Sequence, residues 1–300
     1  MNNVRKLTEG AILLAAFTAL LLITIYTPII GSIINLVLPL PFIIFSAKNS
    51  LKNIIAFLLA AIFISFIAGS FIGLVLMLIY GSAGVVIGYL LQKNKSRTVI
   101  MISSSLTFLV GLVISYAVSV AFFKIDIIHE LTVALNESMK TSQDLFKAMG
   151  NNDQIKLLKE QNANLIKMIE TYAPSVLIMA SIYAAFLTQL ICFPIAKRFG
   201  VNVQPWGSIR NLSFPRSLLW YFLIVMGATI LVHPNESTYF YMVIANANYI
   251  LQMFMVLQGR CFFIIYFTSK VSRKGTSGPN CNSSFRDSNY SLYNNDSGYY

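Results

Sequence analysis

The chain has 300 residues, of which 56% are apolar and only 11% charged, and its mean hydropathy is +0.69. These values exclude a soluble protein, because so few charged side chains cannot cover the surface of so large an apolar core. The formal net charge is +11, but the basic residues occur in small groups between apolar runs. That pattern is typical of membrane topology signals and excludes a nucleic-acid-binding protein.

The uncharged runs predict an all-α, polytopic transmembrane helical bundle of about eight spans, since roughly 20 apolar helical residues cross a bilayer. In chain order the predicted spans cover residues 10–26, 29–46, two arms within 53–92 that divide near Gly69-Ser70, 98–123, 172–196, 218–232 and 239–263. The second span contains Pro39 and Pro41, which interrupt helices. We therefore predict that it is kinked, or that it is an irregular or re-entrant segment shielded by its neighbours.

Lysine and arginine predict the orientation of these spans. If the amino terminus is cytoplasmic, fifteen of the sixteen basic residues outside 124–171 fall on cytoplasmic segments, at Arg5, Lys6, Lys48, Lys52, Lys93, Lys95, Arg97, Lys197, Arg198, Arg210, Arg216, Arg260, Lys270, Arg273 and Lys274. The sixteenth, Arg286, lies in the polar tail. The outer turns at 27–28, 69–70 and 233–237 contain neither residue type. Because cytoplasmic loops are enriched in basic residues, both termini are expected in the cytoplasm.

Residues 124–171 differ from the spans on either side, since they contain seven of the eleven acidic residues together with six lysines. Their apolar residues recur near the helical period, and Gly150 followed by Asn152 and Asp153 is typical of one helix ending and another beginning. We predict an external amphipathic helical hairpin. Its charged faces meet water, or they form a lid or partner surface over the outer mouth of a site.

These features divide the chain into N-terminal membrane helices 1–5 (1–123), the hairpin (124–171), C-terminal membrane helices 6–8 (172–270) and a tail (271–300). The tail is rich in serine, asparagine and tyrosine and nearly lacks aliphatic residues. A segment with so little apolar surface cannot offset the entropy of ordering. We predict a disordered cytoplasmic tail.

No catalytic or nucleotide-binding motif is recognisable. The chain has no Walker sequence, no dinucleotide glycine pattern, no paired carboxylates within a span and no Ser-His-Asp set. Its three cysteines and two histidines lack metal-ligand spacing. We expect neither enzymatic activity nor a cofactor or metal site of these kinds, so active transport would require a partner that hydrolyses ATP.

Two patterns of small residues are present. Ala11, Ala15 and Ala19 follow one another at i, i+4 and i+8 on one face of the first predicted helix. Gly69 with Gly73, and Gly84 with Gly88, form two G-x-x-x-G pairs, which allow helix backbones to approach closely. For the glycines the favoured interpretation is packing within the fold.

A few polar residues interrupt the apolar spans and are the candidates for a substrate pocket. They are Asn35, Gln189, Asn246, Asn248, Tyr249 and Gln252. An amide in hydrocarbon needs a hydrogen-bond partner, which either a ligand or a neighbouring helix can supply. Both interpretations remain open at this point.

Three segments resemble the YybS-like family of bacterial membrane proteins: RKLTEGAILLAA at 5–16, VLPLP at 37–41, and the most specific one, 197–216, which begins KRFGV and ends LSFPR. That family is similar to the S components of energy-coupling factor transporters, which capture vitamins or metals. The resemblance implies a location in the bacterial cell membrane. It also implies that the alanine strip docks on a coupling subunit driven by two ATPases, and that a substrate pocket near the outer side is lined by later helices.

The chain also departs from these relatives. S components typically have six helices and no hairpin of this size, and none of their ligand-binding signatures is recognisable here. YybS-like proteins usually continue hydrophobically where this chain becomes polar, which is what a truncated or shifted reading frame would produce.

A second class of function is a membrane scaffold. Rod-shape-determining proteins of the MreD type resemble S components in fold, and they bind envelope or division proteins in place of solutes. The identity of the bound partner separates the two hypotheses.

Overall fold

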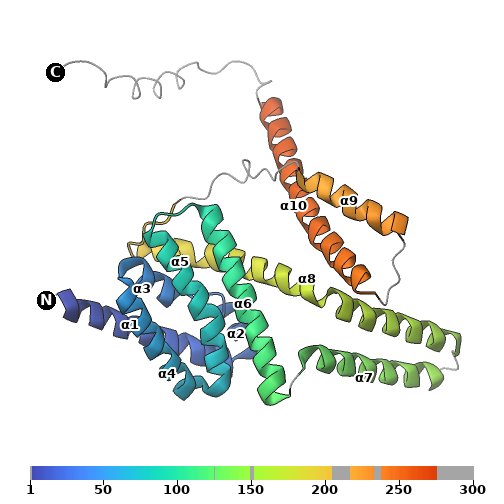
Figure 1. Ribbon diagram of the computed structural model, residues 1–300, viewed down its shortest axis with the longest axis horizontal. Coiled ribbons are helices and arrows are strands. Elements are labelled where there is room, and N and C mark those ends of the chain that lie inside the picture. Colours follow the sequence, from blue (N-terminus) through green and yellow to red (C-terminus); the bar gives the residue numbers. More distant parts are fainter. Residues whose placement is uncertain (1, 125, 149–151, 205–216, 233–237, 276–300) are drawn as a thin grey trace. The chain divides into compact units, whose positions relative to one another are not determined.

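A computed structural model describes residues 2–124, 126–148, 152–204, 217–232 and 238–275. All regular structure within these ranges is helical, as the sequence predicts (Figure 1). The elements are α1 (Asn2–Tyr26), α2 (Pro28–Ile34), α3 (Leu40–Lys48), α4 (Leu51–Leu76), the π-helical turn η1 (Met77–Gly81), α5 (Ser82–Gln92), α6 (Arg97–Phe123), α7 (Ile127–Ala148), α8 (Asn152–Arg198), α9 (Ser217–Val232) and α10 (Tyr239–Gly275).

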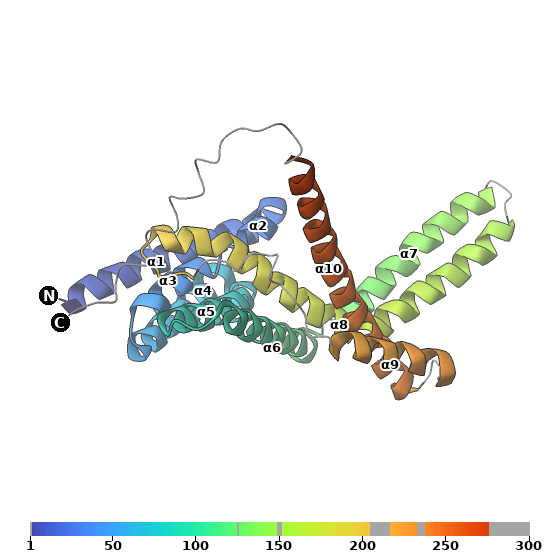
Figure 2. The same ribbon diagram turned by 90° about the horizontal axis from the view of Figure 1, so that it is seen from above.

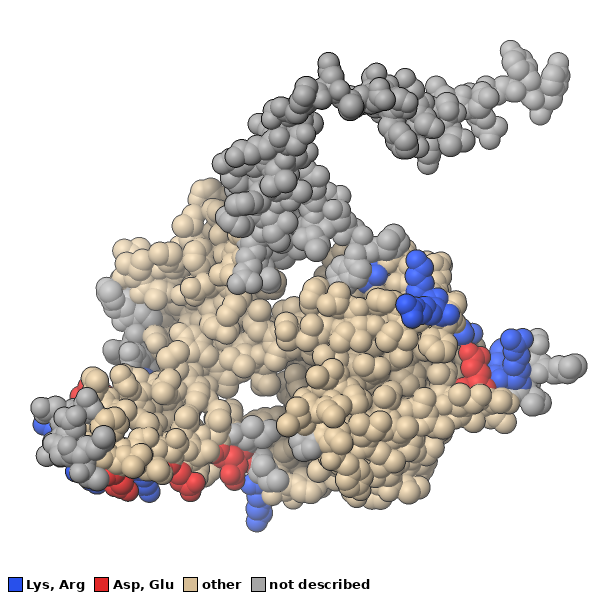
Figure 3. Space-filling view, turned by 180° about the vertical axis from the view of Figure 1, so that it is seen from behind, with Lys and Arg blue, Asp and Glu red and all other residues tan. Residues whose placement is uncertain are grey.

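Several helices are suited to a membrane. Within the described ranges, five stretches are long and apolar enough to cross one: Arg5–Tyr26, Leu51–Gln92, Arg97–Phe123, Ile155–Arg198 and Tyr239–Val256. The apolar helix α9 is shorter. Figure 3 shows a face on which charged side chains occur in a few small groups and most of the described surface is uncharged. These features agree with the predicted multi-pass membrane protein.

The stretch from Leu51 to Gln92 folds back on itself at Ser70. This residue has a φ of 51° and a ψ of −143°, which are not helical values. A Cβ built on Gly73 would lie 2.5 Å from the backbone oxygen of Ser65, whereas eight residues of a straight helix span about 12 Å. The contact therefore requires a reversal of direction, at the position where the sequence predicts the division between two arms.

The predicted second span is not one continuous helix. It consists of α2 and α3, separated by hydrogen-bonded turns over Asn35 to Pro39. Pro39 and Pro41 have no N–H to continue the helical hydrogen bonds, which explains the break. The predicted interruption of this span at its prolines is confirmed, since turns separate α2 from α3.

This broken segment supplies much of the buried core. All six residues from Pro41 to Ser46 are buried. The fully buried ring of Phe42 lies edge-on to Phe17, with ring centroids 4.8 Å apart, and to Phe57 at 5.4 Å. Helix α3 packs most extensively on α5 and also contacts α1, α4 and α8. Backbone groups left without hydrogen bonds at the prolines could not face lipid, and the helix that follows them is covered by other helices of the protein.

Glycines of α5 make this packing possible. A Cβ on Gly84 would lie 2.6 Å from the backbone oxygen of Pro39, and one on Gly88 would lie 2.6 Å from that of Ile43. No side chain fits at such distances, so the predicted G-x-x-x-G packing within the fold is confirmed for this pair.

Helix α7 packs against the first part of α8, and both ribbon views show the two helices side by side (Figures 1 and 2). Asp126 precedes α7 and accepts hydrogen bonds from the backbone N–H groups of Ile128 and His129, at 3.0 and 3.2 Å. The predicted turn around Gly150 lies largely outside the described residues. Helix α8 continues through Thr171 and Tyr172, so the hairpin and the predicted sixth span share one 47-residue helix.

The chain divides into two compact units: residues 1–206 with 216–253, and residues 207–215 with 254–300. The first contains the helices described above up to the first part of α10. The described portion of the second is the remainder of α10, which ends at Gly275. Residues 271–275 are therefore helical, in contrast to the predicted start of the disordered tail, and residues 276–300 lie outside the described ranges.

Candidate functional site

The alanine strip lies on the exposed face of α1. Ala11, Ala15 and Ala19 are all exposed, whereas Phe17 and Leu21 on the opposite face are fully buried. The buried face packs against α3 and α4. The three alanines are therefore not used for packing among the described helices of this chain.

The six pocket candidates do not form one site. Gln189 is buried in the core, Asn35 is partly buried at the break between α2 and α3, Asn246 and Tyr249 contact α8, and Asn248 is partly buried elsewhere on α10. Gln252 is exposed, so the face that it was predicted to share with Asn248 is not a buried one.

Gln189 belongs to a buried hydrogen-bond network between α8 and α6. Its Nε2 donates to Ser104 Oγ at 3.0 Å and approaches Met101 Sδ at 3.4 Å. The Ser104 hydroxyl donates its own hydrogen to the backbone oxygen of Met101, so toward Gln189 it can only accept. This assigns the orientation of the amide and leaves Gln189 Oε1 as a buried acceptor with no hydrogen-bond partner among the described residues.

Asn35 lies at the break between α2 and α3, close to the same face of α8. The neighbouring carbonyl of Leu36 accepts a hydrogen bond from Cys192 Sγ at 3.3 Å. Cys192 lies three residues after Gln189 and therefore on the same side of α8. The side-chain oxygen of Asn35 is buried, and within the described chain it has no hydrogen-bond partner. The sequence did not single out Thr24 or Thr188, whose hydroxyl oxygens share this property.

Asn246 joins α10 to α8 at a proline. Its Oδ1 accepts from the backbone N–H of Ser175 at 3.0 Å, and its Nδ2 donates to the backbone oxygen of Thr171 at 2.7 Å. An uninterrupted helix would join that N–H and that oxygen directly, and Pro174 lies between them. One amide thus bonds to both a donor and an acceptor of α8 beside Pro174. The rings of Tyr249 and Tyr172 lie nearby, tilted by 45° with centroids 5.6 Å apart. The proline was visible in the sequence, but its partner was not.

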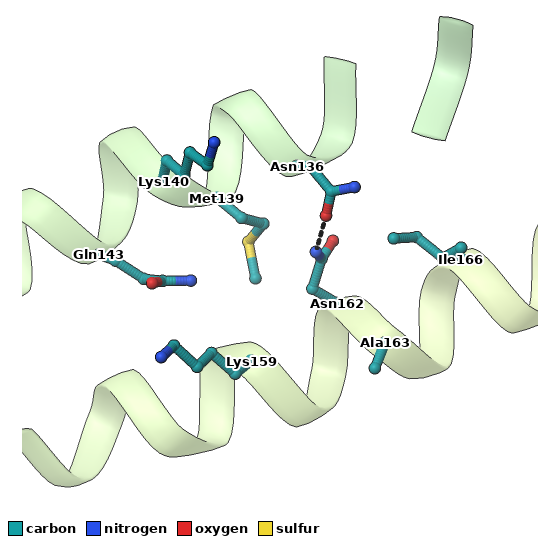
Figure 4. Close-up of a pocket in the computed structure, with 8 residues that line it drawn as sticks. All are labelled: Asn136, Met139, Lys140, Gln143, Lys159, Asn162, Ala163 and Ile166. Atoms are coloured by element: carbon teal, nitrogen blue, oxygen red, sulfur yellow. Dashed lines mark hydrogen bonds between the residues drawn. The ribbon is translucent and has the colours of Figure 1, made fainter. Parts of the chain in front are cut away.

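A pocket of about 440 Å³ lies between α7 and α8. Figure 4 shows the Asn136–Asn162 hydrogen bond, 2.7 Å long, beside Met139, Gln143 and Lys159. The lining residues are Asn136, Met139, Lys140, Gln143, Lys159, Asn162, Ala163 and Ile166. None of them is acidic although the segment is rich in carboxylates, and none was among the sequence candidates.

Outside the membrane stretches, the carboxyl group of Asp126 is the most strongly hydrogen-bonded ionisable group that the structure describes. The backbone N–H of His129 lowers the pKa of Asp126, and the Tyr116 hydroxyl and the Ile128 N–H act in the same direction. No group of three or more His, Cys, Asp or Glu residues suited to a metal ion occurs in the described ranges.

Comparisons with known proteins identify relatives. The chain matches the family described as "Predicted membrane protein (DUF2232)" over residues 15–277. It is 30% identical over 275 residues to a protein of Bacillus subtilis (strain 168) named "Uncharacterized protein YybS", with 90% of this chain and 87% of that protein covered. No solved structure matches the chain.

Proposed function

We propose that this chain, which belongs to the DUF2232 family of predicted membrane proteins, is the substrate-binding subunit of an importer of the energy-coupling factor type. In this proposal a separate membrane subunit couples it to ATPases, and the chain itself catalyses no reaction. The face of Ala11, Ala15 and Ala19 is the contact with the coupling subunit. The observation that supports this most is the exposure of all three alanines opposite a fully buried face of the same helix.

Small side chains suit such a contact for a physical reason. Association of helices in lipid depends on close van der Waals packing, and alanines let two backbones approach. Leucine at the same position would hold a partner helix away without altering the packing of Phe17 or Leu21.

The docking proposal is tested by Ala15→Leu in the full-length chain, followed by affinity purification from membranes. We expect the coupling subunit and ATPases to be lost while the amount of chain in the membrane stays unchanged. Ala16→Leu, on the same helix but off the strip, and Ala56→Leu, on α4, are matched controls because both alanines are also exposed. Equal recovery of the same partner with Ala15→Leu and the controls would contradict docking through this face.

We further propose eight spans, cytoplasmic termini and an extracytoplasmic α7–α8 hairpin. The reversal at Ser70 and the distribution of basic residues support this topology. In a variant without native cysteines, a cysteine at Asn151 should react with an impermeant reagent added outside intact cells. Labelling only after the cytoplasm is opened would overturn the topology.

The scaffold alternative has its own support in the hairpin. Leu145, Leu157 and Met168 are each more than half exposed on its surface, and in this alternative they belong to the surface that binds protein partners. In this alternative the partners recovered with the wild-type chain are envelope or division proteins, and no ATPase accompanies them.

A further inference from the structure

Four buried oxygen atoms without hydrogen-bond partners lie on three segments: the end of α1, the break between α2 and α3, and α8. These are the hydroxyl oxygens of Thr24 and Thr188 and the amide oxygens of Asn35 and Gln189, none of which has a partner in the described chain. Thr188 is fully buried and Gln189 is 1% exposed. A buried oxygen without a partner is destabilising, so four of them require an explanation.

Two close contacts join the chain segments that bear these oxygens. A Cβ built on Gly31 would overlap the backbone oxygen of Thr24, so α2 packs directly against the end of α1. The contact of Cys192 Sγ with the oxygen of Leu36 fixes α8 against the break. Thr188 lies one helical turn before Cys192, and Asn35 precedes Leu36. Asn35, Thr188 and Gln189 are thus within about one turn of the contact at the break, and Thr24 lies where α1 packs on α2, the helix that leads into the break.

The break also frees backbone oxygens. In a continuous helix the carbonyl of Leu36 would accept from residue 40, but the N–H of Leu40 donates to Val37. Residue 39 is a proline and has no N–H to offer in its place. The remaining donor to Leu36 is the thiol of Cys192, which is a weak one. The break therefore adds an available carbonyl to the four side-chain oxygens.

We propose that this region binds a monovalent cation, with sodium preferred, between α1, the break and α8. Neutral oxygens from hydroxyls, amides and an interrupted helix are the ligands that sodium takes within membrane proteins. The orientation of Gln189, set by Ser104, presents its oxygen and not its nitrogen. No carboxylate lies among these residues, which disfavours a divalent ion, because calcium and magnesium sites are built largely on carboxylates.

This inference does not depend on the proposed importer function, because it concerns the chain by itself. The thermal midpoint of the purified full-length chain in detergent is measured in sodium, lithium, potassium and choline chloride at equal ionic strength. A ligand that binds only the folded state raises Tm, by roughly 5 °C or more when present at about 100 times its Kd. We expect sodium to give the largest rise and choline none.

Variants identify the ligands. Thr188→Val and Thr24→Val keep the side-chain volume and remove the hydroxyl, and Gln189→Met removes the amide, so each should lose more than half of the sodium-dependent rise. Thr107→Val and Thr18→Val are the controls, because those hydroxyls donate to backbone oxygens of their own helices at 2.8 Å. The controls should keep the full rise even if their basal Tm changes.

A bridging water would satisfy the same oxygens without any dependence on the ion. Equal Tm values in all four salts would therefore overturn the proposal. A sodium-specific rise that persists undiminished in Thr24→Val, Thr188→Val and Gln189→Met would overturn it as well, because the ion would then bind elsewhere. Equilibrium dialysis with radioactive sodium gives a second reading, with about one ion bound per wild-type chain as the expected result.

Discussion

The broken α2–α3 segment and the α7–α8 hairpin are opposites in sequence and in structure. The first contains two prolines and only short helices, yet every residue from Pro41 to Ser46 is buried. The second contains long, regular amphipathic helices, yet Leu145 and Leu157 are more than half exposed. Strong helical periodicity therefore does not mark the core of this protein, and proline does not mark its surface.

The difference has a physical cause. A helix that satisfies its own backbone hydrogen bonds can extend away from other elements, whereas a broken one leaves polar groups that cannot face lipid. Here α1, α4, α5 and α8 pack around α3, which follows the break, whereas α2, which satisfies its own hydrogen bonds, keeps Ile29 and Ile33 exposed. The hairpin does not require such enclosure.

The largest loss of thermal stability is expected from Phe42→Ala, in the broken segment. Phe42 is fully buried between Phe17 and Phe57, so truncation removes dispersion contacts and leaves a cavity, at a cost of about 3 kcal/mol. Phe66→Ala is the control, because Phe66 is 60% exposed. Thermal unfolding in detergent should show a large loss for the first variant and little change for the second. Similar losses of thermal stability in both variants would contradict a special contribution of the buried Phe42 ring to core packing.

A somewhat smaller loss is expected when the close approach of α5 to α3 is blocked. In Gly84→Ala the new Cβ would lie 2.6 Å from the backbone oxygen of Pro39, and relief of such overlap costs about 1 to 3 kcal/mol. In α9, Gly227→Ala meets no atom within 4 Å and should be neutral or slightly stabilising. The same thermal assay compares the two, and an unchanged Tm for Gly84→Ala would refute the tight contact.

Asn246→Leu tests the junction between α8 and α10. It removes the partner of Thr171 and Ser175, and hydrogen bonds between membrane helices contribute about 0.6 to 1.7 kcal/mol. Hydrogen exchange of the backbone near Pro174 should accelerate. Asn248→Leu, two residues further along α10, is the matched control and should leave that exchange unchanged. Equal hydrogen exchange in the two variants would mean that the Asn246 amide does not stabilise α8 near Pro174.

The smallest change in stability is expected at the start of the hairpin, where Asp126 caps α7. The hydrogen bonds from His129, Tyr116 and Ile128 hold the pKa of Asp126 below its ordinary value. The stabilisation is therefore fully present above the unfolded-state value of about 3.9 and is lost as the pH falls through the lower folded-state value. Hydrogen exchange in the first turn of α7 should accelerate over that range.

Asp126→Ala should remove this pH dependence, whereas Asp144→Ala should retain it, since Asp144 contacts only the exposed Lys147 nearby. A wild-type exchange rate that is insensitive to acid would contradict the role of Asp126 as the cap of α7.

The sequence by itself determined the membrane class, the helical content and most helix limits, because these depend on composition and on local periodicity. It also located the division near Ser70 and the irregular second span, since Gly-Ser and Leu-Pro-Leu-Pro act on the backbone where they occur. The packing of Gly84 and Gly88 followed from their spacing, although their partner did not.

Only the tertiary structure decided which polar residues meet. Leu36, next to Asn35, meets Cys192, three residues after Gln189, because α8 packs against the break between α2 and α3, while Asn246 bonds to the backbone of α8 beside Pro174. Thr24 and Thr188 resemble any other threonine in an apolar span. Whether such a hydroxyl bonds to its own helix, as Thr18 and Thr107 do, or is left without a partner depends on contacts between segments distant in the chain, and no local pattern records them.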